Sequence, residues 1–284
     1  MTSIIKEDIN YLEVQIDKIS TFNEKICNTI RRLILSEIPV YGFHPDDVDI
    51  DKNTSILNND IMRHRISGLP IQLLKETNNE HLNISLSINI LNNDGENKQI
   101  TTDDCVVKVN NNIRKNMLPE PPIIICNLKP NQELILTSIA SYDKGFTNAN
   151  YYDAGYSFFW EKDDNFVLTI EGKGQLDCKD IFNKACNIYI ERLKELQTLL
   201  HTHDNITTNH INIKIKGENH TLMDLLTYDI QQNKNINYTS FKLDNLFDNN
   251  SILEIITNKT QSVQQIFDKS VKKLTDLFYD IQLK

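Results

Sequence analysis

The same order of elements occurs twice in the sequence: a strand, a short helix, another strand and a long helix. This repetition limits the possible folds more than any other feature. In each copy the long helix, predicted over residues 178–200 and again over 260–282, carries an apolar stripe at helical spacing. Such a stripe must be covered by other helices, and neither copy has enough apolar helical surface to cover its own. The repetition therefore predicts two pseudo-symmetric halves that bury their helices against each other.

In the first copy, alternating apolar residues at 12, 14 and 16 predict a half-buried strand. Thr21 and Glu24 fit a capping box, which predicts that a helix begins there and spans 22–37. A second, short helical stretch is predicted at 59–67. In the second copy, strands are predicted at 211–215 and 252–256, with a helix over 221–232 that opens at Thr221.

The four main helices are expected to close one shared core. Its predicted members are apolar, lie on the predicted inner faces, and contribute roughly 1.5–3 kcal/mol each when fully buried. They are Ile26, Ile30, Leu33, Phe182, Tyr189, Leu193, Leu196, Leu225, Leu226, Ile266, Phe267, Leu274, Leu277 and Phe278.

Residues 78–162 differ from the rest because short alternating runs and turn signals replace the helical pattern. We expect a β-rich insert domain there. Residues 201–210 are polar without periodicity and are expected to form a linker. The predicted fold class is α+β, with residues 1–77 and 163–200 as the first half, 78–162 as the insert and 211–284 as the second half.

Charge and composition exclude several classes of protein. The formal net charge of -9 argues against a surface that grips nucleic acid directly. The longest apolar runs are about five residues, far below the length that spans a membrane, and no apolar leader opens the sequence. The five cysteines are scattered without a C-x-x-C pair, which predicts buried thiols in a reducing, intracellular compartment.

No motif predicts a catalytic residue, a cofactor or a bound metal. The eight glycines form no nucleotide-binding loop. Asp46, Asp47, Asp49 and Asp51 could hold a divalent cation, but a solvated acidic face is the favoured interpretation. A metal enzyme based on this run stays a distant alternative, which metal analysis of the purified chain tests.

Two adjacent arginines, Arg31 and Arg32, lie on an otherwise apolar helix and can reach a neighbouring protein with bidentate guanidinium groups. Together with Asn28 they form an N-x-x-R-R pattern, followed by N-T-S-I-L-N-N-D at 53–60 and H-R-I-S-G-L-P at 64–70. This combination strongly resembles the alpha-like subunits of cellular RNA polymerases: archaeal D, the third-largest subunit of eukaryotic polymerase II and the amino-terminal domain of bacterial alpha.

The resemblance extends over about residues 9–281. Residues 127–134 are similar to the family's K-x-G-Q-x-[LI] strand, with Asn131 in place of glycine, and Asn148 stands where the family has histidine. Residues 170–176 match the entry to the family's long dimerisation helix. Residues 218–226 resemble the E-D-H-T-L-G-N-L-L of the smaller partner subunit, with Met223 and Asp224 departing from it. In the resembled family the two halves are usually separate chains that dimerise, and their fusion in one chain resembles the arrangement in some large DNA viruses.

The resemblance implies a non-catalytic assembly platform for the two largest subunits of a multisubunit DNA-directed RNA polymerase, with a small subunit as a further partner and no sequence-specific nucleic-acid contact. A viral chain would lie in the host cytoplasm and the virion, and a cellular one in the nucleus or cytoplasm with the polymerase. The implied interface to the second-largest subunit comprises Asn28, Arg31, Arg32, Asn53, Ser55, Asn58, Asp60, His64 and Arg65. The implied face toward the largest subunit comprises His220, Thr221 and Leu222. The alternative is a stand-alone acidic dimerisation protein that has kept the fold and left the polymerase.

Overall fold

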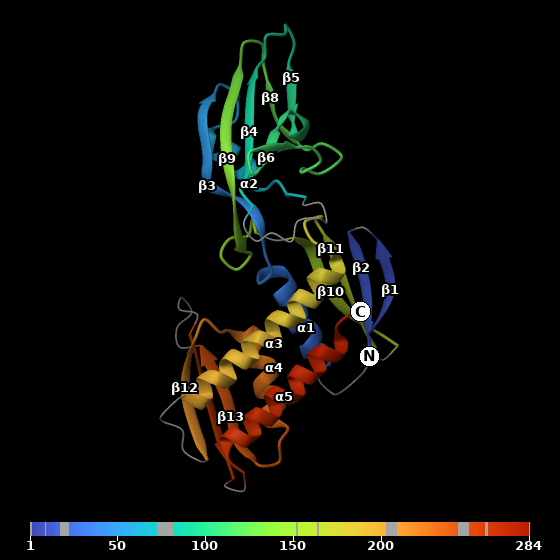
Figure 1. The fold of residues 1–284 in the computed structure, drawn as a ribbon, viewed down its shortest axis with the longest axis vertical. Helices are drawn as coiled ribbons and strands as arrows, with labels where there is room; N and C mark the ends of the chain where they lie inside the picture. Colours follow the sequence, from blue (N-terminus) through green and yellow to red (C-terminus); the bar gives the residue numbers. More distant parts are fainter. Residues whose placement is uncertain are drawn as a thin grey trace.

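A computed structural model of the 284-residue chain describes residues 2–8, 10–17, 23–72, 82–151, 153–163, 165–202, 209–243, 250–258 and 261–283. The predicted capping box of Thr21 and Glu24 lies partly outside the described residues, because Thr21 is not among them. Figure 1 shows an elongated molecule, with helices and two sheets at one end and a separate group of strands at the other.

Two antiparallel sheets repeat one strand order. The first sheet has the order β1-β2-β11-β10, with β1 at Thr2–Asp8, β2 at Tyr11–Ile16, β11 at Asn165–Gly172 and β10 at Ala154–Lys162. The second has the order β12-β14-β13, with β12 at His210–Lys216, β14 at Asn250–Thr257 and β13 at Ile236–Leu243. Strands β2, β11 and β10 thus correspond in order to β12, β14 and β13, and β1 is an addition to the first sheet.

Four helices join these sheets through one hydrophobic cluster (Figure 1). They are α1 (Asn23–Ser36), α3 (Cys178–Thr202), α4 (His220–Gln231) and α5 (Val263–Ile281). Helix α3 packs along α5, and α1 contacts both α3 and α4. The N-terminal strand is tied to the second half as well, since the Thr2 hydroxyl donates to the carbonyl of Ile281 at 3.0 Å.

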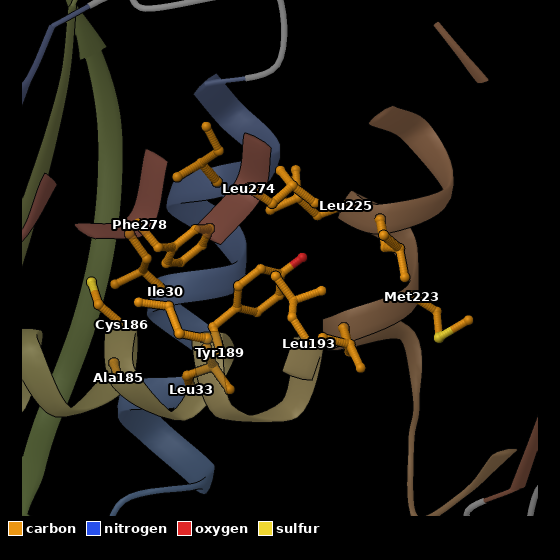
Figure 2. Packing of buried hydrophobic residues seen from close by; sticks show 14 of the residues in the cluster. Ile30, Leu33, Ala185, Cys186, Tyr189, Leu193, Met223, Leu225, Leu274 and Phe278 are labelled. Carbon is orange, nitrogen blue, oxygen red and sulfur yellow. The ribbon is translucent and has the colours of Figure 1, made fainter. Parts of the chain in front are cut away.

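Every residue expected in the helical core is buried in this cluster except Leu277, which is partly buried and packs against it. Figure 2 shows side chains from α1, α3, α4 and α5 meeting around Tyr189, which has no exposed surface. The Tyr189 ring stacks on Phe278 of the second half, with centroids 4.2 Å apart. The helical pairing of the two halves is therefore a continuous apolar interior.

The strand-rich end of the molecule has its own hydrophobic cluster. A five-stranded sheet has the order β3-β9-β4-β6-β7, with β3 at Pro39–Asn53, β9 at Glu133–Lys144, β4 at Ile84–Leu91, β6 at Val106–Val109 and β7 at Asn112–Arg114. Strands β5 (Lys98–Thr101) and β8 (Ile124–Leu128) form a separate pair, and a short 3-10 helix spans Thr102–Asp104. Helix α2 (Asn59–Ser67) packs on β3.

The structure departs from the expected division at both boundaries of the insert. Residues 78–162 were assigned to the insert, yet β10 at Ala154–Lys162 pairs with β11 and belongs to the sheet of the first half. Residues 1–77 were assigned to the first half, yet β3 pairs with β9 from Pro39 to Asn53 and belongs to the sheet of the insert. Met62 and Ile66 of α2 are fully buried in the same cluster. Partners such as Pro39 and Lys144 are far apart in the sequence, and nothing in the local pattern of β3 reveals that pairing.

Polar contacts fix the junction between the two groups of elements. Gln175 accepts the Tyr41 N–H at 2.6 Å and donates to the carbonyl oxygens of Tyr41 and Ile71 at 2.9 and 3.2 Å. The Asp153 carboxylate accepts the N–H groups of Gln175 and Leu176. Burial raises the pKa of Asp153 to about 6, and these backbone hydrogen bonds oppose the rise.

Two local details of the backbone explain sequence features. Asn131 has a φ of +62°, a left-handed conformation that asparagine tolerates better than most residues, so it can stand where the resembled family has glycine. Helix α4 is capped by Asn219, whose side chain accepts the Thr221 N–H at 2.8 Å. The helix begins at His220, one residue before the predicted start at Thr221, and Asn219 rather than Thr221 caps it.

Candidate subunit interface

The polar edge of α1 carries the paired arginines. Asn28 accepts hydrogen bonds from Nη2 and Nε of Arg31 at 2.9 and 3.3 Å, so the asparagine holds this guanidinium in one orientation. Arg32 is half-buried like Arg31, and within the described part of the chain no hydrogen bond or ion pair of its guanidinium is present. The opposite face of α1, with Ile26, Ile30 and Leu33, is buried in the helical core. Judged from the described residues, the helix therefore presents side by side an arginine held by Asn28 and an arginine without such a contact.

The segment before α2 is a network of short hydrogen bonds. Asn53 donates to the Leu57 carbonyl and to Asn59, each at 2.9 Å, and accepts from the Ser55 hydroxyl at 2.6 Å. Asn58 then caps α2, since its side chain accepts the Ile61 N–H at 2.9 Å. Asparagine and serine in this order give the loop a defined shape, which accounts for the N-T-S-I-L-N-N-D pattern.

Helix α2 turns an outward face to solvent. Asp60, Ile61, His64 and Arg65 line a shallow hollow on it, and Arg65 donates to the carbonyl of Ile125 at 2.8 Å. Ile61 is 46% exposed among these charged side chains, and Ile56 in the preceding loop is 80% exposed. An exposed apolar side chain in the middle of charged groups suits a surface that a partner covers.

The structure brings only part of the patch predicted to face the largest subunit, His220 to Leu222, to the surface. His220 is exposed, lies 3.6 Å from the Asp224 carboxylate and contacts the Phe241 ring edge-on. Thr221 and Leu222 are buried, with relative exposures of 5% and 1%, and Thr221 accepts a hydrogen bond from Thr29 of α1. The expectation that these two residues face a partner subunit was therefore wrong: they join α4 to α1.

A charged cluster between the halves was missed by the sequence analysis. Glu37, at the end of α1, accepts hydrogen bonds from Arg192 of α3 at 2.5 Å and from Lys144 at 3.1 Å. Arg192 also lies 3.9 Å from Glu218, which belongs to the second half. The sequence does contain a sign of this cluster, a charged residue next to the predicted core. Arg192 follows Tyr189 by three residues and therefore lies beside it on the same face of the helix.

Burial favours the protonated form of Glu218 in this cluster. It raises the pKa of Glu218 to about 7, an effect that the Arg192 guanidinium reduces and the Glu37 carboxylate increases. One Glu218 carboxylate oxygen is buried without a hydrogen-bond partner among the described residues. The cluster thus links both halves and leaves one buried acid incompletely satisfied.

The described residues contain no group of three or more His, Cys, Asp or Glu side chains arranged to hold a metal ion. The acidic run from Asp46 to Asp51 lies on β3 with its carboxylates exposed. His203 of the linker lies outside the described residues, whereas His201 and His210 contact Asp268 and Glu254.

None of the described helices is long and apolar enough to cross a membrane.

The fold and the buried helical seam define an intramolecular dimer of two related halves. Residues 18–193 match the model of the RNA polymerase Rpb3/Rpb11 dimerisation domain, and residues 210–283 match a second model with the same description. The chain belongs to the RNA polymerase Rpb3/Rpb11 dimerisation domain family.

Two relatives agree with the family models. A protein of Acanthamoeba polyphaga mimivirus that carries the name of a DNA-directed RNA polymerase subunit is 28% identical over 258 residues, covering 75% of this chain and 72% of the relative. DNA-directed RNA polymerase II subunit RPB3 of Schizosaccharomyces pombe is 27% identical over 135 residues, covering 40% of this chain and 45% of that subunit. The chain is an assembly subunit of a multisubunit RNA polymerase, with two fused alpha-like halves, and it associates with other polymerase subunits. The stand-alone dimerisation protein is not favoured.

Proposed function

We propose that the chain is a non-catalytic platform on which the two largest subunits of the polymerase are mounted. The observation that supports this proposal is the continuous core between the halves, in which Tyr189 of α3 stacks on Phe278 of α5. A core of this kind fixes the relative position of the two outer surfaces, which is what a platform must do. The viral relative supports an origin in a large DNA virus.

The proposed contact with the second-largest subunit has two parts. One is the α1 edge with Asn28, Arg31 and Arg32, where planar guanidinium groups are available to carboxylates of a partner. The other is the loop and helix from Asn53 to Arg65, with its exposed isoleucines. His220 marks the proposed contact with the largest subunit, and Thr221 and Leu222 serve the internal core instead.

Fusion has a physical consequence for assembly. Joining the two halves in one chain raises the effective concentration of one half around the other to about the millimolar range. Pairing of the halves then does not depend on how much protein is made.

We propose that residues 39–71 act with the β-rich insert, because their side chains share its hydrophobic cluster.

The test is a double variant, Arg31→Ala with Arg32→Ala, expressed with a tag alongside the two largest subunits. Both side chains are half-buried at the helix edge and outside the core, so folding should be nearly unchanged while recovery of the large subunits falls at least about tenfold. The matched control replaces Lys269 and Lys272, two exposed cations on α5, with alanine. Full recovery of the large subunits by the arginine variant would refute the assignment.

A further inference from the structure

Three aromatic side chains form a ladder on the edge strand of the first sheet. Tyr156, Phe158 and Trp160 alternate along β10, so they point to the same face. Their ring centroids are 5.5 and 5.2 Å apart, and the side chains are 41%, 45% and 36% exposed. This face is the outer one, because the residues of β2 and β11 that enter the helical core, such as Leu12 and Leu168, point the other way.

Carboxylates lie beside this aromatic ladder. Glu171 is directly opposite Tyr156 in the β10–β11 pair, and this carboxylate raises the pKa of the Tyr156 hydroxyl. Glu13, one strand further on, accepts a hydrogen bond from the Tyr11 hydroxyl. Lys6 places its ammonium 4.8 Å from the centre of the Tyr11 ring. Among the described residues no lysine or arginine occupies the corresponding position over Phe158 or Trp160.

The equivalent sheet of the second half provides an internal comparison. Its outer face carries Lys214 on β12 and Lys242 on β13, both opposite Ile252 of β14. Only Tyr238 is exposed there among the aromatic residues of β13, at 49%. Glu254 also places a carboxylate on the outer face of the second sheet, so among the described residues it is the stacked aromatic ladder, and not the acidic side chains, that distinguishes the first half and is not required by the fold.

We propose that the outer face of the first sheet binds a basic segment of a partner protein. Lysine or arginine side chains of that segment lie over the faces of Phe158 and Trp160 and pair with Glu13 and Glu171. Exposed stacked rings can also bind nucleic-acid bases, but the two carboxylates repel phosphate. The proposal does not depend on which subunits bind at α1 and α2.

Trp160 makes a direct test possible, because it is the single tryptophan of the chain. The intact protein is titrated with a ten-residue peptide of alternating arginine and serine, a glutamate–serine peptide and a ten-nucleotide oligothymidylate. We expect only the arginine peptide to change the Trp160 emission and to protect it from acrylamide quenching. An unchanged emission at millimolar peptide, or equal binding of the acidic peptide or the oligonucleotide, would overturn the proposal.

Variants separate the ladder from general charge effects. Phe158→Ser should weaken peptide binding about two- to fivefold, the size of one exposed cation–π contact. Glu13→Gln with Glu171→Gln should weaken binding further and reduce its dependence on salt. The control, Tyr238→Ser on the second sheet, should leave binding unchanged, and a loss as large as that of Phe158→Ser would contradict a site on the first sheet.

A second measurement uses the assembled polymerase. A photoreactive benzophenone side chain replaces Phe158, and the cross-linked partner segment is sequenced. We expect a segment with an excess of lysine and arginine. An acidic segment, a nucleic-acid adduct or no adduct at all would each overturn the proposal.

Discussion

Replacing Tyr189 with phenylalanine, which removes one oxygen atom from the centre of the helical core, is predicted to stabilise the protein. Tyr189 has no exposed surface, and its hydroxyl has no hydrogen-bond partner among the described residues. Figure 2 shows this hydroxyl among the side chains of the helical core, where burial and the carboxylates of Asp229 and Glu218 raise the pKa of Tyr189 well above its usual value. A buried hydroxyl without a partner costs about 1–3 kcal/mol, so Tyr189→Phe should raise the free energy of unfolding by about that amount.

The assay is urea unfolding followed by circular dichroism. With a slope of roughly 3 kcal/mol per molar urea, Tyr189→Phe should move the midpoint upward by about 0.3–1 M. Tyr189→Ala should move it in the opposite direction, because losing the ring and its stacking on Phe278 costs about 3–5 kcal/mol. The control is Tyr238→Phe at an exposed tyrosine, which should change stability by less than about 0.5 kcal/mol. A lower midpoint for Tyr189→Phe would mean that the hydroxyl has a partner and that the description of the seam as apolar is wrong.

Three further predictions concern charged and reactive groups. Burial raises the pKa of Glu218 from 4.5 to about 7, so the folded state binds its proton more tightly and stability should fall as pH rises from about 4.5 to about 7. Glu218→Gln should remove this part of the slope and unfold at higher urea than the wild type at pH 8, and an unchanged slope would contradict the burial of this acid. Lys273 lies 2.5 Å from Asp229, whose side chain is 3% exposed, so Lys273→Met should destabilise the protein clearly more than Lys272→Met in the same urea assay. Burial raises the pKa of Cys27 and of Cys105 to about 12, so both thiols should react with a disulfide reagent far more slowly in native than in unfolded protein, and equal rates would count against their environments.

The sequence predicted those elements whose buried side chains have a clear period. Helices α1 and α3 and strand β2 each place an apolar set on one face, and that face lies in the helical core. Strand β1 was missed because its residues after Thr2 are all exposed, and β13 was missed because it contains no buried residue. Alternation is a signal of half-burial, and these two strands lack it.

The candidate site was predictable in part for a similar reason. Asn28, Arg31 and Arg32 were recognised because two arginines on an apolar helix are unusual, and the structure places them half-buried at the edge of that helix, outside the core. Thr221 and Leu222 were assigned to a partner surface by the resemblance alone, whereas the structure buries both side chains with Leu225 and Leu226 of α4. The pairing of β3 with β9 depends on contacts between distant residues, which no local pattern contains.

The most direct measurement of the central claim is purification of the tagged chain from its native source in physiological salt, followed by sedimentation and identification of its partners. A platform subunit should sediment with a complex of several hundred kilodaltons that contains the two largest polymerase subunits in equal amounts with this chain. A species of 32.9 kDa that sediments alone, with no large subunit attached, would contradict the platform function.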